Sequence, residues 1–302
     1  RCVQPQGTRG RHRVDTDHLQ VGVDRTQHPC HPGGMTSGAH RAHQNVDRPE
    51  LVEEFFGQTA IRLDVVGVVV LVGAPGAGVG GRQLRDAVLS RLLPSTDRVR
   101  LGTGICLVPQ RNPVYTAKQV TDLDNLSGGR VDFGVGVGWL REEFEAVAMP
   151  FEKRGQRTDE HLAVMKALWT EEPSEFHGEL YDLPACSMYP KPVQTPHPPI
   201  HVGGESDAAM RRVARHAQGW FSFNRLPGDL AEPLGRLDRI LGEHDRSRDD
   251  ILLTVCPYFN PVTPEMVEQY AEAGVDRLVV LCLAFDVDTL NSQLDGLVAD
   301  VL

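Results

Sequence analysis

The stretch Leu126-Ser-Gly-Gly-Arg-Val-Asp-Phe-Gly-Val-Gly-Val-Gly-Trp139 decides the fold, because it ends one helix and begins one buried strand. Upstream of it, apolar residues recur at helical spacing after Asn112-Pro113, a pair typical of a helix start. Gly128 and Gly129 then provide a glycine C-cap. The run 131–138, Val-Asp-Phe-Gly-Val-Gly-Val-Gly, predicts a strand.

Predicted strands and helices continue to alternate toward the C-terminus. Six strands are predicted, at 98–108, 131–138, 200–205, 219–223, 251–259 and 277–283. Helices are predicted at 112–127, 160–169, 207–216, 229–244, 264–273 and 288–302, and a proline-rich excursion at 181–199 interrupts the rhythm. Repeated βα units predict a parallel sheet with right-handed crossovers. A closed (β/α)8 barrel needs eight units, so two more must come from residues 1–94 or be missing.

Composition divides the chain near residue 95. Residues 1–94 have a net charge of +2 and no Lys, Tyr or Trp, whereas residues 95–302 have a net charge of −12. The first fifty residues hold half of the histidines and show no apolar periodicity, so they offer too little apolar surface to offset the entropy of ordering them. We therefore expect a disordered or non-native segment over 1–60 and one α/β domain over 61–302, with 95–302 as its clearest part.

The net charge, the cysteine spacing and the apolar runs of the sequence disfavour several classes of protein. The net charge of −10 disfavours a sequence-independent nucleic-acid binder. The six cysteines are scattered without a C-x-x-C pair, which indicates reduced cytoplasmic thiols and no metal site. The longest apolar run, 65–73, is too short to span a bilayer, and the N-terminal residues lack the apolar core of a secretory signal.

A glycine-rich motif follows that apolar run. Gly76-x-Gly78-x-x-Gly81 satisfies the dinucleotide fingerprint, in which glycines let a backbone approach a pyrophosphate. The acidic residue expected about 20 positions further on has no convincing occupant. Val79 also stands where a P-loop requires lysine. A plain loop is the favoured interpretation, and nucleotide binding stays as an alternative.

Four strings taken together resemble the luciferase-like monooxygenase superfamily, and its coenzyme F420-dependent branch in particular. They are Arg98-Val-Arg-Leu-Gly-Thr-Gly104, the stretch 126–139, Tyr189-Pro-Lys-Pro-Val-Gln194 and Pro199-Ile-His-Val-Gly-Gly-Glu-Ser206. The resemblance covers residues 95–302 and does not extend over 1–94. It implies a TIM-barrel-like (β/α)8 fold with its site at the carboxyl ends of the strands.

The resemblance also implies which residues contact the coenzyme. Gly104-Ile105 corresponds to a bulged non-prolyl cis peptide behind the ring of F420 or FMN. The end of the next strand packs against the ring or substrate, and the turn 203–206, with Ser206 and Asp207 as N-cap candidates, holds the coenzyme phosphate. The expected cofactor-binding residues are Gly104, Ile105, Val137, Gly138, Trp139, Gly203, Gly204, Glu205 and Ser206.

The expected reaction is hydride transfer between F420 and a small organic substrate, in a cytoplasmic protein that forms a homodimer. The residues identify no catalytic side chain. His201 is interpreted mainly as a core residue, and Lys191 and Gln194 as residues that shape a lid over the pocket. Two alternatives remain open: an FMN-dependent monooxygenase, and an inactive or truncated barrel homologue without catalysis.

Overall fold

The computed structural model of the chain describes residues 99–282 and 287–301. The expectations for residues 1–60, and for the glycine motif at 76–81, lie outside the described residues. Within them, one parallel sheet runs in the order β1-β3-β6-β7-β8-β9, with β2 also paired to β3. The order follows the chain without reversal, as in a barrel and unlike a doubly wound sheet.

The strands alternate with helices as the sequence predicts. The sheet strands are β1 (Leu101–Gly102), β2 (Cys106–Leu107), β3 (Val131–Gly136), β6 (Ile200–Gly203), β7 (Gly219–Phe223), β8 (Leu252–Cys256) and β9 (Arg277–Leu278). The helices are α3 (Pro113–Ser127), α4 (Arg141–Ala146), α5 (Arg154–Thr170), α6 (Asp207–His216), α7 (Ala231–Gly242), α8 (Pro264–Glu272) and α9 (Val287–Val301). Short 3-10 turns are η3 (Val108–Gln110), η4 (Pro227–Asp229) and η5 (Arg248–Asp250).

Local signals explain the helix ends. The side chain of Asn112 accepts hydrogen bonds from the amides of Val114 and Tyr115 at the start of α3. Gly128 ends the same helix with φ at +65°, a conformation that glycine adopts without steric cost. Both predicted caps are confirmed.

Four predictions of secondary structure need correction. The strands predicted at 251–259 and 277–283 are shorter, because β8 ends at Cys256 and β9 ends at Leu278. The excursion contains an antiparallel hairpin, β4 (Ser174–His177) with β5 (Asp182–Cys186), which the sequence analysis treated as irregular. The first predicted strand, 98–108, is split into β1 and β2 by a break between them, because the backbone bulges at Gly104.

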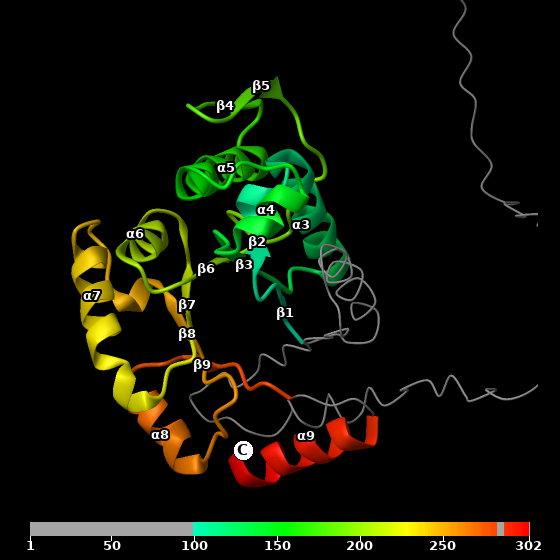
Figure 1. Ribbon diagram of the computed structural model, residues 1–302. Helices are drawn as coiled ribbons and strands as arrows, with labels where there is room; N and C mark the ends of the chain where they lie inside the picture. The colour runs from blue at the N-terminus through cyan, green and yellow to red at the C-terminus, as the bar shows by residue number, and fades with distance from the viewer. Residues whose placement is uncertain (1–98, 283–286, 302) are drawn as a thin grey trace, which may run out of the picture. The chain divides into compact units, whose positions relative to one another are not determined.

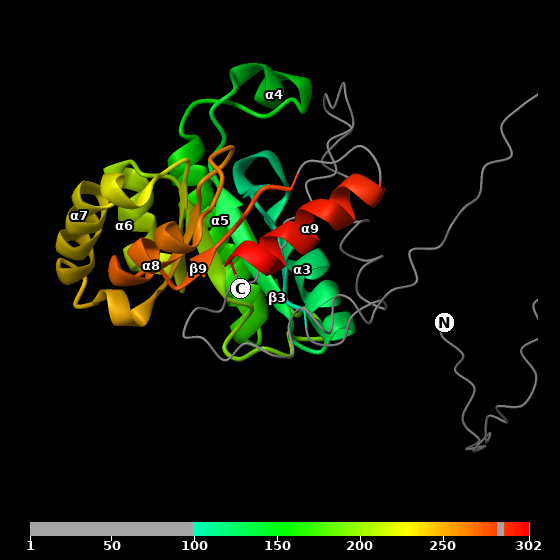
Figure 2. The same cartoon turned by 90° about the horizontal axis from the view of Figure 1, so that it is seen from below.

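The outer face of the sheet carries the apolar core. Val131, Phe133 and Val135 alternate on this face of β3 and are buried, and the side chain of Trp220 on β7 is fully buried. Figure 1 shows α5, α6, α7 and α8 along the outer side of the curved sheet. Figure 2 shows α4 at one end of the strands, apart from the flanking helices.

An ion pair across the inner face shows how strongly the sheet curls. Arg277 on β9 donates from Nη1 to Oδ2 of Asp132 on β3, at 3.1 Å. Four strand spacings separate β3 from β9, which is roughly 19 Å in a flat sheet. Because the two side chains cannot bridge that distance, the sheet must curve around its inner face. The predicted barrel-like α/β fold is confirmed as a curled parallel half-barrel.

Candidate functional site

The peptide bond between Gly104 and Ile105 is cis and does not involve proline. This confirms the conformation that the resemblance implies. The side chain of Ile105 extends over β3 and β6: a Cβ added to Gly136 would lie 2.0 Å from Ile105 Cδ1, and one added to Gly203 would lie 3.5 Å away. Glycine at the ends of two neighbouring strands therefore makes room for Ile105, which brings the 104–105 segment beside the ends of β3 and β6.

The loop after β3 holds Val137, Gly138 and Trp139. Gly138 has φ at +74°, and its carbonyl accepts a hydrogen bond of 3.0 Å from Nε of Arg154. A Cβ at Gly138 would lie 3.0 Å from the buried ring of Phe144. The side chain of Trp139 is 82% exposed, so it is not a helix-packing residue within the part of the chain that the structure describes.

The turn after β6 leads into α6. Ser206 caps this helix, since its Oγ accepts from the amide of Ala209 at 3.2 Å. Gly204 is held by β7, because its amide donates to the carbonyl of Phe221 and its carbonyl accepts from Nε1 of Trp220. The amide of Gly204 is therefore already hydrogen-bonded within the sheet. The amides of Asp207 and Ala208, in the first turn of α6, have no acceptor within the helix.

Glu205 points toward β7 rather than toward the start of α6. Its carboxylate accepts from Oγ of Ser222 at 2.6 Å and from Nε of Arg225 at 2.9 and 3.0 Å. Burial opposes ionisation of this carboxyl, but the hydrogen bonds from Arg225 and Ser222 outweigh burial and lower the pKa of Glu205. The negative charge of Glu205 is thus compensated by Arg225.

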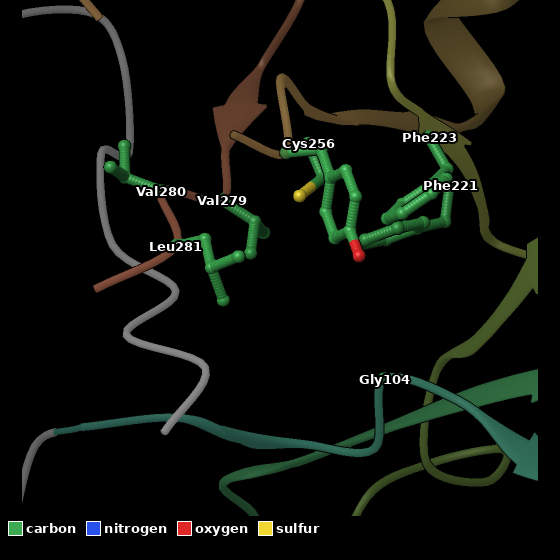
Figure 3. Close-up of a pocket in the computed structure, with 8 residues that line it drawn as sticks. Gly104, Phe221, Phe223, Cys256, Val279, Val280 and Leu281 are labelled. Carbon is green, nitrogen blue, oxygen red and sulfur yellow. The ribbon is translucent and has the colours of Figure 1, made fainter. Parts of the chain in front are cut away.

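A small pocket opens beside the cis peptide. Figure 3 shows Gly104 across from Phe221, Phe223 and Cys256. Tyr258 and residues 279–281 complete the lining, and the enclosed space is about 60 Å³. The register of β7 and β8 explains why Phe221, Phe223 and Cys256 line the pocket together. Phe223 pairs with Cys256, and alternate residues of a strand share one face. The pocket lies where these strands end, as expected for a site on this fold.

His201 lies away from this pocket. It is 6% exposed on β6, and its Nε2 is 3.7 Å from Oδ1 of Asp132. Asp132 also accepts from Arg100 and Arg277, so His201 belongs to a charged cluster on the inner face near the start of the strands. The interpretation of His201 as a core residue is confirmed.

Lys191 and Gln194 do not form a lid. Lys191 donates to the carbonyls of Leu168 and Glu171 at the end of α5. Gln194 donates from its side chain to Asp124 and to the carbonyl of Val131. Because Val131 begins β3, these bonds fix the excursion to the amino end of the sheet, opposite the pocket, and the lid prediction is wrong.

Sequence reasoning missed the aromatic side of the pocket. The alternation in Gly219-Trp-Phe-Ser-Phe223 places Phe221 and Phe223 on one face, a period-2 signal that could have identified them. It also missed Gln110, which is 8% exposed at the end of η3 and whose side-chain amide has no hydrogen-bond partner among the described residues. No cluster of metal-binding side chains occurs within residues 99–282 and 287–301. In the same ranges, no helix has the length and apolar character needed to cross a membrane.

Comparison with known proteins identifies the family. The model of the luciferase-like monooxygenase family matches residues 86–280, and the chain belongs to this family. Rv0940c of Mycobacterium tuberculosis is 41% identical over 185 residues, which are 61% of this chain and 62% of that protein. The FMNH(2)-dependent dimethylsulfone monooxygenase of Pseudomonas putida is 33% identical over 153 residues, 49% of this chain and 42% of the relative.

The solved structures agree on the fold. The coenzyme F420-dependent tetrahydromethanopterin reductase of Methanopyrus kandleri superposes with a TM-score of 0.62 at 16% identity, over 72% of this chain and 86% of the reductase. At that identity the likeness concerns the fold alone. The chain spans about 62% of the length of the first curated relatives that it matches.

Proposed function

We propose that this chain binds coenzyme F420 and catalyses hydride transfer between it and a small organic substrate. The observation that carries the proposal is the apolar pocket at the carboxyl ends of the strands, in which the backbone of Gly104 faces the side chains of Phe221 and Phe223. Membership of the luciferase-like monooxygenase family supports the same class of chemistry.

The residues around the pocket fit a flat ring. Gly104 presents backbone without a side chain, so a planar heterocycle can lie against it at van der Waals distance. Phe221 and Phe223 provide apolar surface on the opposite wall of the pocket. In this proposal Ile105 packs beside the ring site, because its side chain fills the space over Gly136 and Gly203 at the ends of β3 and β6.

The start of α6 fits the anionic tail of the coenzyme. The amides of Asp207 and Ala208 are oriented by the helix, and the helix dipole favours an anion there. Ser206 can donate its hydroxyl proton to that anion while its oxygen accepts from Ala209. The pairing of Glu205 with Arg225 removes an uncompensated negative charge from the neighbourhood.

When bound, the coenzyme supplies the hydride acceptor or donor. The chain's own residues orient the ring against Gly104 and exclude water through the apolar lining of the pocket. Arg225 compensates the negative charge of Glu205 beside the turn.

Titration of the purified chain with F420 and, separately, with FMN tests the proposal. We expect saturable binding of F420, seen as a change in its absorbance or fluorescence, and weaker binding of FMN. Binding of neither coenzyme would contradict the proposal. Tight binding of FMN alone would favour an FMN-dependent monooxygenase, an alternative supported by the 33% identity to the dimethylsulfone monooxygenase.

We also propose that the chain forms a homodimer and needs no nucleic acid or membrane partner. Sedimentation should then give one species of about twice 33.3 kDa. A stable monomer that binds the coenzyme would contradict the dimer alone. A soluble chain that binds neither coenzyme would instead favour the inactive barrel homologue.

A further inference from the structure

The side of the pocket that faces Gly104 is aromatic. Phe221, Phe223 and Tyr258 form this aromatic wall. The ring centroid of Tyr258 is 4.6 Å from that of Phe223 and 4.0 Å from that of Phe259. Phe223 is 51% exposed and Phe259 is 63% exposed, so the rings offer surface that a ligand can cover.

The backbone of Tyr258 sets it apart from its neighbours. Its φ is +62°, in the left-handed region that a bulky residue adopts at a cost and glycine adopts freely. The turn around it is closed by Asn260, whose amide and side chain both donate to the carbonyl of Pro257. Glycine would adopt this backbone conformation more easily than tyrosine. We therefore attribute the presence of Tyr258 to the contacts that its ring makes in the pocket.

None of the described residues that line the pocket has a charged side chain. The polar side-chain groups among the lining residues are the hydroxyl of Tyr258 and the thiol of Cys256. Burial raises the pKa of Cys256, so this thiol is uncharged at neutral pH. An ionised ligand would lose its hydration here and find no counter-charge, whereas a neutral planar ligand would gain stacking and apolar contact.

We infer that the pocket receives the substrate as a neutral aromatic compound and that Tyr258 selects it by stacking. The inference rests on the proposed function, in which the coenzyme ring lies on the Gly104 side and the substrate lies between that ring and the aromatic wall. Tyr258 is then a specificity-determining residue.

Calorimetric titration of the full chain with 2-acetylnaphthalene and 2-naphthoate tests this inference, with and without F420 or FMN. The two probes share a two-ring frame and differ in charge. We expect the neutral ketone to bind about tenfold or more tightly than the carboxylate. The substitution Tyr258→Gly should weaken binding of the ketone by about tenfold and leave the turn intact.

Asp245→Gly is the matched control, because Asp245 also has a positive φ, of +55°, in the loop after α7 and outside the pocket lining. This control should bind the ketone like the unaltered chain. Equal or tighter binding of the carboxylate, or no effect of Tyr258→Gly, would overturn the inference. A chain that binds a coenzyme but neither probe would overturn it while leaving the proposed function standing. Selective binding of the ketone without binding of either coenzyme would overturn the proposed function and leave the selection of a neutral aromatic ligand standing.

Discussion

Gly219 and His201 are neighbours on the inner face of the sheet, and only glycine fits at position 219. A Cβ there would lie 2.1 Å from Nδ1 of His201, whose ring is buried beside Asp132. We predict that Gly219→Ala destabilises the fold by about 1–3 kcal/mol, because the imidazole cannot move away freely. Urea unfolding measures this change in free energy.

Gly235→Ala is the control for that substitution. A Cβ at Gly235 would meet nothing within 4 Å, and the residue lies inside α7. Alanine should therefore stabilise the helix by about 0.5–1 kcal/mol. Equal effects of the two substitutions would contradict the packing described for β6 and β7.

Asp132 gives the fold a specific dependence on pH. Burial disfavours its charge, but the nearby imidazole of His201, 3.7 Å away, and the hydrogen bonds from Arg100 dominate and hold its pKa well below the usual range. In the unfolded chain Asp132 takes up a proton near pH 4, while the folded chain keeps it ionised. Stability from this group is therefore present above about pH 4 and is lost as the pH falls toward the folded pKa.

We predict that Asp132→Asn removes part of the loss of folding stability at low pH. The unaltered chain should lose up to about 1.4 kcal/mol per pH unit through this group below pH 4, and the variant should lose less. The variant should also be less stable by about 3–5 kcal/mol at pH 7, because the buried Arg277 loses its partner. Parallel acid limbs in the two proteins, measured by chemical unfolding between pH 2 and 7, would show that Asp132 does not carry this dependence.

At the scale of elements, the cap of α6 links stability to coenzyme binding. Ser206→Ala removes the acceptor for the amide of Ala209 and should cost about 1 kcal/mol of stability. It should also weaken F420 binding several-fold, since the same hydroxyl donates to the anionic tail in our proposal.

Thr263→Ala separates these two effects. Thr263 caps α8 by accepting from the amide of Met266 at 3.3 Å, and no pocket residue lies in that helix. The Thr263 variant should lose similar stability and keep its affinity for F420, as measured by fluorescence titration. If both variants bind F420 equally well, α6 is not the phosphate site.

The sequence predicted most elements because each βα unit carries its own local signals. The caps at Asn112, Gly128 and Ser206 depend on residues within one turn, so a linear pattern reveals them. The β4–β5 hairpin was not predicted from the sequence, because its strands are short and mostly exposed and its second strand contains a proline. Tyr258 escaped because a turn, rather than a periodic strand, brings it to the pocket.

At the scale of the whole molecule, the curl of the sheet depends on contacts that no local pattern reveals. Asp132 and Arg277 are 145 residues apart and meet only because the strands between them curve. The number of βα units and their parallel order could be read from the sequence. The charged cluster on the inner face could not, because charges at strand positions usually face solvent.

A double-mutant cycle on Asp132 and Arg277 tests the curl in solution. We predict a coupling free energy of about 1–3 kcal/mol for this pair, because both side chains are largely buried. The exposed pair of Arg239, on α7, and Glu243, the residue that follows α7, should give about 0.3–0.5 kcal/mol. Similar small values for both pairs, from urea unfolding, would indicate that β3 and β9 do not meet as described.

The central claim is that the coenzyme ring lies against the backbone of Gly104, next to Ile105. The most direct measurement is the nuclear Overhauser effect between the ring protons of bound F420 and the methyl groups of isoleucine, with Ile105 assigned through Ile105→Val. Our account predicts cross-peaks from the ring to Ile105 that disappear in the variant. Bound coenzyme with cross-peaks to other isoleucines and none to Ile105 would contradict it.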